Sequence, residues 1–202
     1  MNIDGVRILI LSLAGILLMS TSSNSAPSPS PAVLKTATFG GGCFWCMEAV
    51  YHYVPGITKI TSGFAGGTTD NPTYDQVCTG RTGHAEVIQI TYDPAKVSYD
   101  QLLDLFWKAH DPTTLNRQGA DHGTQYRSII LTSNAEEASE AEASKKKAQA
   151  QFPDQIVTEI VPLKAFYPAE DYHQDYYQNN KDKNPYCQVV IAPKLRKLGL
   201  EK

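Results

Sequence analysis

The sequence has little of the features that mark several special classes of protein. Of its 202 residues, 18 are Lys or Arg and 21 are Asp or Glu, so a net charge of −3 offers no basic surface for a nucleic acid. Only 4 residues are Cys, too few for a disulfide scaffold in a chain of this length. The 14 Gly, 12 Pro and 11 Tyr are scattered rather than repeated, which excludes collagen-like and solenoid architectures. These absences leave an ordinary globular domain.

One apolar run lies near the N-terminus, and it is short. Arg7 precedes twelve largely apolar residues, 8–19, and small residues follow at 20–26. This is the order of regions in a secretory signal peptide, and twelve residues are too few to cross a bilayer comfortably. We therefore expect residues 1–26 to be a signal peptide of an exported protein, periplasmic or secreted. Asp4 and Pro27 weaken the cleavage site, so an uncleaved membrane tether is the alternative.

Residues 27–34 form a linker rich in Pro and Ser, and a domain follows at 35–202. Roughly 165 residues are enough for one core that buries about 70% of the unfolded surface. Hydrophobic periodicity predicts strands at 35–39, 57–65, 85–92, 127–132 and 156–161. It predicts helices at 43–54, from the Ser98 cap to before Pro112, from the Asn134 cap to 147, and at 168–177.

This element order favours an α+β fold. It contains the elements of a split βαβ unit, so we expect a ferredoxin-like α/β roll on a mixed, largely antiparallel sheet. Long polar loops are expected at 66–84 and 110–126, and long loops in compact domains are usually functional. Beyond about residue 184 we expect an irregular C-terminal tail.

Cys43 is a candidate nucleophile. It follows Gly40, Gly41 and Gly42 at the expected start of a helix, where free backbone N–H groups and the helix dipole favour a thiolate. The glycines indicate a close approach of the backbone that an inert core cysteine would not require. Cys46, three residues later, completes a Cys-x-x-Cys pair, although a small hydrophobic residue on the apolar helix face is the simpler interpretation of Cys46.

Several ordered motifs resemble those of the A-type peptide methionine-sulfoxide reductases. They are Gly42-Cys43-Phe44-Trp45, Ser62 to Gly67 (SGFAGG), Gly83-His84-Ala85-Glu86, Asp121 to Arg127 (DHGTQYR) and Ala169 to Gln174 (AEDYHQ). The resemblance runs from about Ala37 to Pro193. It implies that 35–202 is a catalytic domain that reduces the S epimer of free or protein-bound methionine sulfoxide to methionine, a repair of oxidised proteins.

The resemblance also assigns roles to individual residues. A thiolate that attacks the sulfoxide sulfur must shed the oxygen, which leaves only when protonated, so a carboxylic acid beside an apolar pocket is needed. The implied nucleophile is Cys43, the proton donor Glu86, the oxygen-side hydrogen-bond donors Tyr74 and Tyr126, the assisting acid Asp121, and the residues that hold the methyl group Phe44 and Trp45.

The product of this chemistry is a sulfenic acid on Cys43, which a second thiol converts to a disulfide. Cys187 is the first choice for this resolving cysteine, because it follows Pro185 in the expected tail, as in family members with a resolving cysteine near the C-terminus. Cys46 stands where the family more often has glycine, which leaves a Cys43–Cys46 bridge open. Cys78, in a polar loop before Glu86, is interpreted as structural or a bystander. A thioredoxin-like dithiol would reduce the disulfide.

No metal or prosthetic group is expected. His84, His110, His122 and His173 lack the spacing of a zinc site and are interpreted as loop or supporting groups. Partners are then oxidised proteins or peptides and the reductant, with no nucleic acid, and the protein is expected to be a monomer. Two alternatives are a thioredoxin-like disulfide oxidoreductase, which would need no Cys187, and a small zinc-binding module that uses all four cysteines.

Overall fold

The structure, a computed structural model, describes residue 1 and residues 33–202. The expected signal peptide or tether at 1–26 and most of the linker at 27–34 lie outside the described residues. Ala32–Lys202 forms one compact unit. Within the described residues, no helix is long and apolar enough to cross a bilayer.

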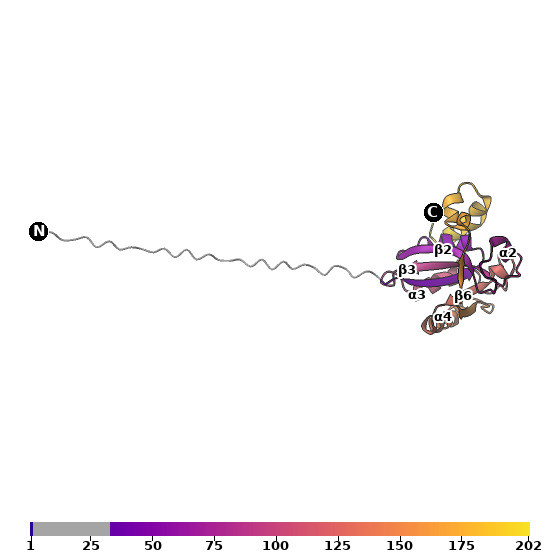
Figure 1. Cartoon of the computed structure of the whole chain (residues 1–202), viewed down its shortest axis with the longest axis horizontal. Helices are drawn as coiled ribbons and strands as arrows, with labels where there is room; N and C mark the ends of the chain where they lie inside the picture. The colour runs from indigo at the N-terminus through magenta and orange to yellow at the C-terminus, as the bar shows by residue number, and fades with distance from the viewer. Residues whose placement is uncertain (2–32) are drawn as a thin grey trace. The chain divides into compact units, whose positions relative to one another are not determined.

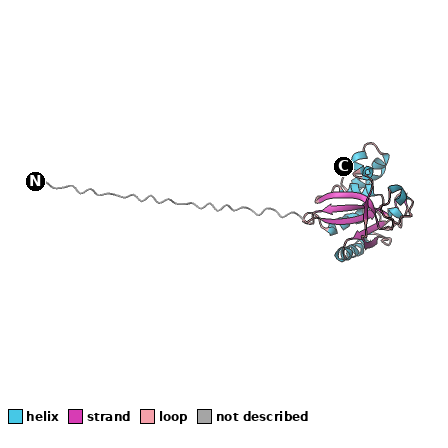
Figure 2. Cartoon of the chain, viewed as in Figure 1, coloured by secondary structure: helices cyan, strands magenta, loops and turns pink. Residues whose placement is uncertain are grey.

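A six-stranded sheet in the order β7-β6-β1-β3-β2-β8 is the centre of the domain (Figure 2). All neighbouring strands are antiparallel except β6 and β7, which are parallel. The expected α+β roll with a mixed, largely antiparallel sheet is therefore confirmed. The strands are β1 (Lys35–Gly41), β2 (Ile57–Ala65), β3 (Ala85–Tyr92), β6 (Ser128–Thr132), β7 (Glu159–Pro162) and β8 (Phe166–Pro168).

The central strands are buried on both faces. Side chains alternate along a strand, so Ile88 and Ile90 enter the large aromatic core on one face of the sheet. Val87, Ile129 and Leu131 point to the other face and form a smaller cluster there. Strands that are apolar on both faces give continuous hydrophobic runs, which is why AEVIQITY and RSIILT were readable as strands.

Helices pack on the face of the sheet that carries the large aromatic core, and others lie beside its edge strands. In Figure 1, α4 (Ala135–Ala148) lies beside β6, and the C-terminal segment lies on the side of β2. The other helices are α1 (Phe44–Tyr51), α2 (Tyr74–Cys78), α3 (Tyr99–Ala109), α5 (Tyr176–Asn180) and α6 (Ala192–Lys197). The predicted caps are present: Ser98 and Gln101 form a capping box at α3, and Asn134 accepts a hydrogen bond from the Glu137 N–H at α4.

The C-terminal part of the domain differs from the sequence prediction. Pro168 starts no helix but ends the edge strand β8, where its missing N–H breaks no ladder. The expected irregular tail is helical: a π-helical turn, η4 (Cys187–Ile191), continues into α6. Cys187, Ile191 and Leu195 recur every four residues and are fully buried, and Pro193 is tolerated because it lies in the first turn of α6.

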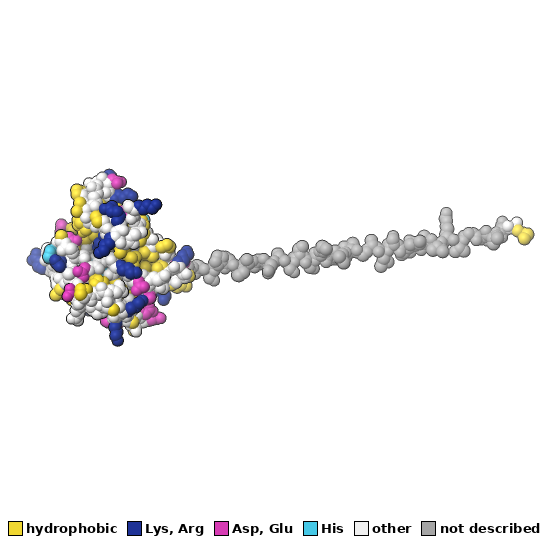
Figure 3. Space-filling view, turned by 180° about the vertical axis from the view of Figure 1, so that it is seen from behind, with side chains coloured by type: hydrophobic (Ala, Val, Ile, Leu, Met, Phe, Trp, Pro, Cys, Tyr) yellow, Lys and Arg dark blue, Asp and Glu magenta, His cyan; other side chains and the backbone are white. Residues whose placement is uncertain are grey.

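The surface carries charges of both signs. On the face drawn in Figure 3, Lys and Arg side chains lie among Asp and Glu side chains and hydrophobic ones. This mixture agrees with the small net charge of −3.

Candidate active site

The glycine turn at 40–42 connects β1 to the start of α1, and neighbouring atoms leave no room for side chains at these glycines. Gly42 has a φ of +89°, and a Cβ atom there would lie 2.6 Å from the Gln118 side chain. A Cβ at Gly40 would lie 2.8 Å from the Glu86 carbonyl oxygen. Cys43 follows as the N-cap of α1 and is 8% exposed. The predicted close approach of the backbone at these glycines is confirmed.

Glu86 lies beside this turn, on the first residues of β3. Its Oε2 accepts a hydrogen bond of 3.0 Å from the Phe44 N–H, the first helical N–H of α1. The carboxyl group is 1% exposed. Burial raises its pKa to about 8, although the Phe44 N–H acts in the opposite direction. Glu86 is therefore mostly protonated at neutral pH, which is the state a proton donor requires.

A cavity of about 200 Å³ opens next to Cys43 and Glu86. It gathers groups from segments that are far apart in the sequence: the start of α1, α2, β3, the two-stranded ribbon of β4 (Arg117–Gln118) and β5 (Asp121–His122), and the 3-10 turn η1 (Thr124–Tyr126). All seven residues expected at the sulfoxide site line it, together with one that was not expected, Tyr186. The lining residues are Cys43, Phe44, Trp45, Tyr74, Glu86, Asp121, Tyr126 and Tyr186.

Tyr74 and Tyr126 are neutral hydroxyl donors at the cavity. Burial, followed by the nearby Glu86 carboxyl, raises the pKa of both phenols above the ordinary value. Tyr74 stands at the start of α2, where Thr73 and Gln76 form a capping box, and its backbone N–H donates to Glu170 Oε1. The expected loop at 66–84 thus contains a short helix that fixes Tyr74.

Two aromatic residues form the apolar side of the cavity, and they are not equivalent. Phe44 is 1% exposed and packs on Phe64 of β2, with ring centroids 5.8 Å apart. Trp45 is half-buried and stacks on Tyr176, with centroids 3.6 Å apart and planes 7° apart. The Trp45 indole N–H also donates to His173 Nδ1 at 3.2 Å. Trp45 is therefore held rigidly from two sides.

Cys46 does not line this cavity. Cys43 is the N-cap and Cys46 the third residue of α1, two positions whose side chains face each other across the first turn. Both line a second cavity of about 130 Å³. Tyr186 borders both cavities: its hydroxyl donates to Asp121 Oδ2 at 3.0 Å and lies 3.7 Å from Cys46 Sγ.

The two thiols titrate in opposite directions. Burial raises the pKa of Cys43 well above its usual value, and Cys46 and Glu86 raise it further. Interaction with the Cys43 thiol lowers the pKa of Cys46 to about 7 despite burial, and Lys194 contributes to that lowering. The expectation of a Cys43 thiolate is therefore wrong for the substrate-free site. The helix N–H that would stabilise it, that of Phe44, is already bound to Glu86.

Comparison with known proteins decides the family. A sequence model of the family "Peptide methionine sulfoxide reductase" matches residues 35–202. The peptide methionine sulfoxide reductase MsrA of Leptospira borgpetersenii serovar Hardjo-bovis is 56% identical over 164 residues, 81% of this chain and 93% of that protein. This chain belongs to the peptide methionine sulfoxide reductase family. It is of the A type, and it reduces methionine sulfoxide in a thiol-dependent reaction.

Other relatives and solved structures agree. The MsrA of Saccharolobus solfataricus is 52% identical over 164 residues, 81% of this chain and 92% of that protein. The crystal structure of Mxr1 from Saccharomyces cerevisiae in reduced form matches with a TM-score of 0.73 at 38% identity, over 79% of this chain and 92% of that one. The structure of Mxr1 in complex with Trx2 matches with a TM-score of 0.53 at 28% identity, over 75% and 91%.

Cys187 and Cys78 occupy different surroundings in the reductase. Cys187 is 0% exposed at the start of η4, not on a free tail, and lines neither of the two cavities. Cys78 is exposed at the end of α2. All four cysteines are free thiols, and the described residues contain no group of His, Cys, Asp or Glu that could hold a metal ion.

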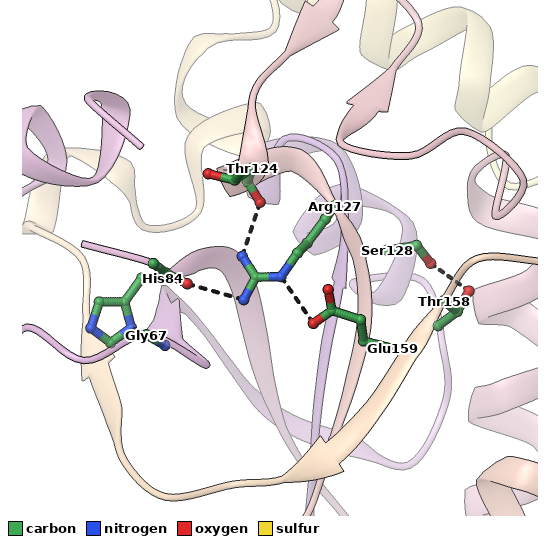
Figure 4. A network of polar contacts seen from close by, with 8 residues as sticks. Gly67, His84, Thr124, Arg127, Ser128, Thr158 and Glu159 are labelled. Carbon is green, nitrogen blue, oxygen red and sulfur yellow. Dashed lines mark hydrogen bonds and ion pairs between the residues drawn. The ribbon is translucent and has the colours of Figure 1, made fainter. Parts of the chain in front are cut away.

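A buried arginine ties together the loops that carry the oxygen-side residues. Arg127 donates to the Gly83 carbonyl at 3.1 Å, to the Thr124 carbonyl at 2.9 Å and to Glu159 Oε2 at 3.2 Å (Figure 4). Gly83 leads into Glu86, and Thr124 leads into Tyr126. One side chain thus holds together the segments that lead to Glu86 and to Tyr126.

None of His84, His110, His122 and His173 lines the cavity of about 200 Å³. His84 Nδ1 accepts from the Gly67 N–H at 3.1 Å, next to the arginine cluster in Figure 4. His110 is buried between the Phe106 carbonyl and the Ser128 hydroxyl, at 2.8 and 2.7 Å. Burial lowers the pKa of His110 to about 4, so it stays neutral.

Sequence reasoning missed Tyr186, Tyr176 and Lys194. Tyr186 is adjacent to Cys187 in the same short segment, but nothing in its local pattern places it at the cavity. Lys194 lines the second cavity together with Cys46. The helical spacing of 187, 191 and 195 was the available signal that this segment folds back onto the domain.

Proposed function

We propose that Cys43 attacks the sulfur of a methionine S-sulfoxide bound in the 200 Å³ cavity, while Glu86 supplies a proton to the oxygen. The observation that carries this proposal is the pairing of a thiol and a carboxyl group whose pKa is raised to about 8 in one small cavity. The sulfoxide is reduced to methionine, its oxygen ends on Cys43 as a sulfenic acid, and the Cys43 thiol is oxidised by two electrons. The proton that leaves the Cys43 thiol replaces the one that Glu86 gives to the oxygen, so the step has no net proton change. The preference for the S epimer follows from the family resemblance.

The other lining residues bind and orient the sulfoxide. Tyr74 and Tyr126 donate hydrogen bonds to the oxygen, and their neutral hydroxyl groups suit a site where negative charge develops. Asp121 assists by fixing the Tyr186 hydroxyl that borders the cavity. Trp45, backed by the buried Phe44, holds the methyl group against an apolar ring. One chain lines the whole cavity, so a monomer suffices for the reaction.

We propose Cys46 as the thiol that first reacts with the Cys43 sulfenic acid. It faces Cys43 across the first turn of α1, and its pKa of about 7 gives a substantial thiolate population at neutral pH. Cys187, the first choice from the sequence, stays a prediction. It would need η4 to move, because it is fully buried in a helical segment.

A thioredoxin-like dithiol is the proposed reductant. One similar structure is that of Mxr1 in complex with Trx2, which supports a protein dithiol as the donor. Exchange of the reductant's two thiols with the enzyme disulfide returns two thiols to the enzyme and leaves a disulfide on the reductant.

A single-turnover experiment tests the proposal. Reduced enzyme is mixed with each sulfoxide epimer of an N-acetylated methionine without a reductant, and methionine release is measured. The wild type should release about one equivalent from the S epimer only, whereas Cys43→Ser should release none, because a serine hydroxyl is far less nucleophilic than a cysteine sulfur. Residual turnover in Cys43→Ser would refute the assignment.

Peptide mapping of the oxidised enzyme after that turnover identifies the resolving cysteine. A Cys43–Cys46 bridge, with thioredoxin-dependent cycling retained in Cys187→Ser, would support Cys46. A bridge to Cys187, with cycling lost in Cys187→Ser and retained in Cys46→Ser, would restore the choice made from the sequence.

We propose that residues 1–26 direct export to the periplasm or the exterior. The order of basic, apolar and small residues supports this proposal. Mass spectrometry of the N-terminus, on protein isolated from separate cell fractions, tests it. A terminus near Pro27 in the exported fraction supports cleavage, an intact chain in the membrane fraction supports the tether, and an intact chain in the cytosol would contradict export.

A further inference from the structure

The cavity behind Cys43 contains a lysine that the reduction of the sulfoxide does not use. The cavity of about 130 Å³ lies between the first turn of α1, the β4–β5 ribbon and α6. Lys194 of α6 lines it with both thiols, and within residues 33–202 it forms no ion pair. The complete lining is Cys43, Cys46, Gln118, Gly119, Ala120, Asp121, Tyr186, Val190 and Lys194.

This cavity and the sulfoxide cavity differ in the residues that line them. Glu86, Tyr74 and Tyr126 line only the sulfoxide cavity, whereas Cys46 and Lys194 line only the one behind it. Cys43 borders both. Asp121 and Tyr186 also border both cavities. Glu86 and the lysine therefore line different cavities next to Cys43, which separates an acidic group from the groups around the Cys46 thiol.

We propose that this second cavity is the recycling side of the active site, and that Lys194 is a positioning residue that holds the Cys46 thiolate there. The proposal rests on the proposed role of Cys46. In the first step the Cys46 thiolate attacks the sulfur of the Cys43 sulfenic acid, an S–S bond forms, the S–O bond breaks, and the oxygen leaves as water with the proton that Cys46 released. In the second step the dithiol reductant gives two electrons and two protons to the disulfide and becomes a disulfide itself.

The electrostatics around Cys46 agree with this role. A cation near a buried thiol favours the charged form, and Lys194 shifts the pKa of Cys46 downward. The other charged or titratable groups around Cys46 are Cys43 from the start of α1, Tyr186 before η4, Asp121 from β5, Cys187 of η4 and Glu86 of β3. Asp121 acts against the thiolate, so within this set Lys194 is the one cation that favours it.

Three variants isolate the charge. Lys194→Met keeps the aliphatic stem and removes the charge, Lys194→Arg restores a charge, and Lys197→Met removes a lysine of the same helix that does not line this cavity. Each reduced enzyme receives one equivalent of S-sulfoxide without reductant. Methionine release reports the sulfoxide side, and trapping of sulfenic acid with dimedone against time reports the recycling side.

We expect methionine release to be unchanged in all three variants. In Lys194→Met the sulfenic acid should persist about fivefold longer at pH 7, because a pKa rise of about one unit, from about 7 to about 8, lowers the thiolate fraction by about that factor. The pH midpoint for alkylation of Cys46 in the reduced enzyme should be higher in Lys194→Met than in the wild type, because the cation that favours the thiolate is removed. Lys194→Arg should restore both values, and Lys197→Met should match the wild type.

Several outcomes would overturn the proposal. Sulfenic acid that disappears from Lys194→Met at the wild-type rate, or an alkylation midpoint that does not move, would exclude a role for the charge. Slower methionine release would place Lys194 on the sulfoxide side. If Lys194→Met fails to fold, Lys194→Gln takes its place. Peptide mapping of the same samples tests the proposed role of Cys46 separately from that of Lys194. A Cys43–Cys187 bridge in the wild type would refute the role of Cys46 itself.

Discussion

The two cavities that meet at Cys43 are built from the same first turn of α1, yet they hold opposite chemistry. On the sulfoxide side, burial without a cation keeps Glu86 protonated and raises the pKa of the Cys43 thiol. On the other side, Cys46 is as deeply buried but has the Cys43 thiol and Lys194 nearby, and its pKa falls to about 7. Burial alone thus does not set the state of a thiol here, because the neighbouring groups decide between acid and base.

Glu86→Gln should have the largest effect, and it should affect one side only. Loss of a positioned proton donor slows the chemical step by roughly 10²–10⁴-fold, so methionine release in a single turnover should fall by that factor. As a control, sulfenic acid is formed on Cys43 with hydrogen peroxide, and its conversion to the disulfide should keep the wild-type rate. Near-normal methionine release would show that another group, such as Tyr126, supplies the proton.

The pH dependence of stability should distinguish the two sides next. The folded-state pKa of Glu86, about 8, lies above the ordinary 4.5, so its contribution to stability is complete below pH 4.5 and is lost as the pH rises through 8. The maximum loss is about 5 kcal/mol. Urea unfolding of the reduced enzyme between pH 5 and 9 should show this fall in the wild type and a flatter profile in Glu86→Gln.

The contribution of Cys46 to the free energy of unfolding should change with pH in the direction opposite to that of Glu86. Its folded-state pKa lies below the ordinary 9, so its contribution to stability is present above pH 9 and is lost as the pH falls through about 7. In Cys46→Ser the free energy of unfolding should therefore lack a rise between pH 7 and 9. If the free energy of unfolding changed with pH in the same way in Cys46→Ser and in the wild type, the proposed difference between the two cavities would be refuted.

Substitution of the tyrosines should have a smaller effect. Tyr126→Phe removes one of two hydroxyl donors on the sulfoxide side and should slow methionine release about tenfold, the value of one hydrogen bond of about 1–1.5 kcal/mol. Tyr186→Phe should slow both methionine release and disulfide formation, because its hydroxyl borders both cavities. An effect of Tyr186→Phe on one step alone would assign Tyr186 to that side.

Cys78→Ser should have the smallest effect. Cys78 is exposed on α2 and lines neither cavity, so both rates should stay within about twofold of the wild type. A clear loss of thioredoxin-dependent cycling in steady-state assays would show that Cys78 takes part in recycling. The surroundings of Cys78 would then be a third functional region beside the two cavities.

The first two thirds of the domain were readable from the sequence. Strand alternation at Ile88 and Ile90, the capping residues Ser98 and Asn134, and the Gly42 turn are local signals, and each is present in the structure. The C-terminal third was less readable. Pro168 and Pro193 suggested a helix start and an irregular tail, but one ends an edge strand and the other lies in the first turn of a helix.

The sequence by itself determined the chemistry-bearing groups. A cysteine after three glycines, a Cys-x-x-Cys pair and the ordered motifs of the resemblance were sufficient for the family and for seven of the eight residues that line the sulfoxide cavity, Tyr186 being the exception. These signals are local, because glycine geometry, capping and residue type act within a few residues of each other.

Only the tertiary structure decided the protonation states of Glu86 and the two thiols, and the different roles proposed for Cys43 and Cys46. Glu86 accepts the hydrogen bond from the Phe44 N–H that would otherwise stabilise a Cys43 thiolate. The C-terminal helix α6 brings Lys194 to the same cavity as Cys46, 148 positions earlier in the sequence. A pKa depends on burial and on charges close in space, and no local pattern encodes which distant segment will supply them.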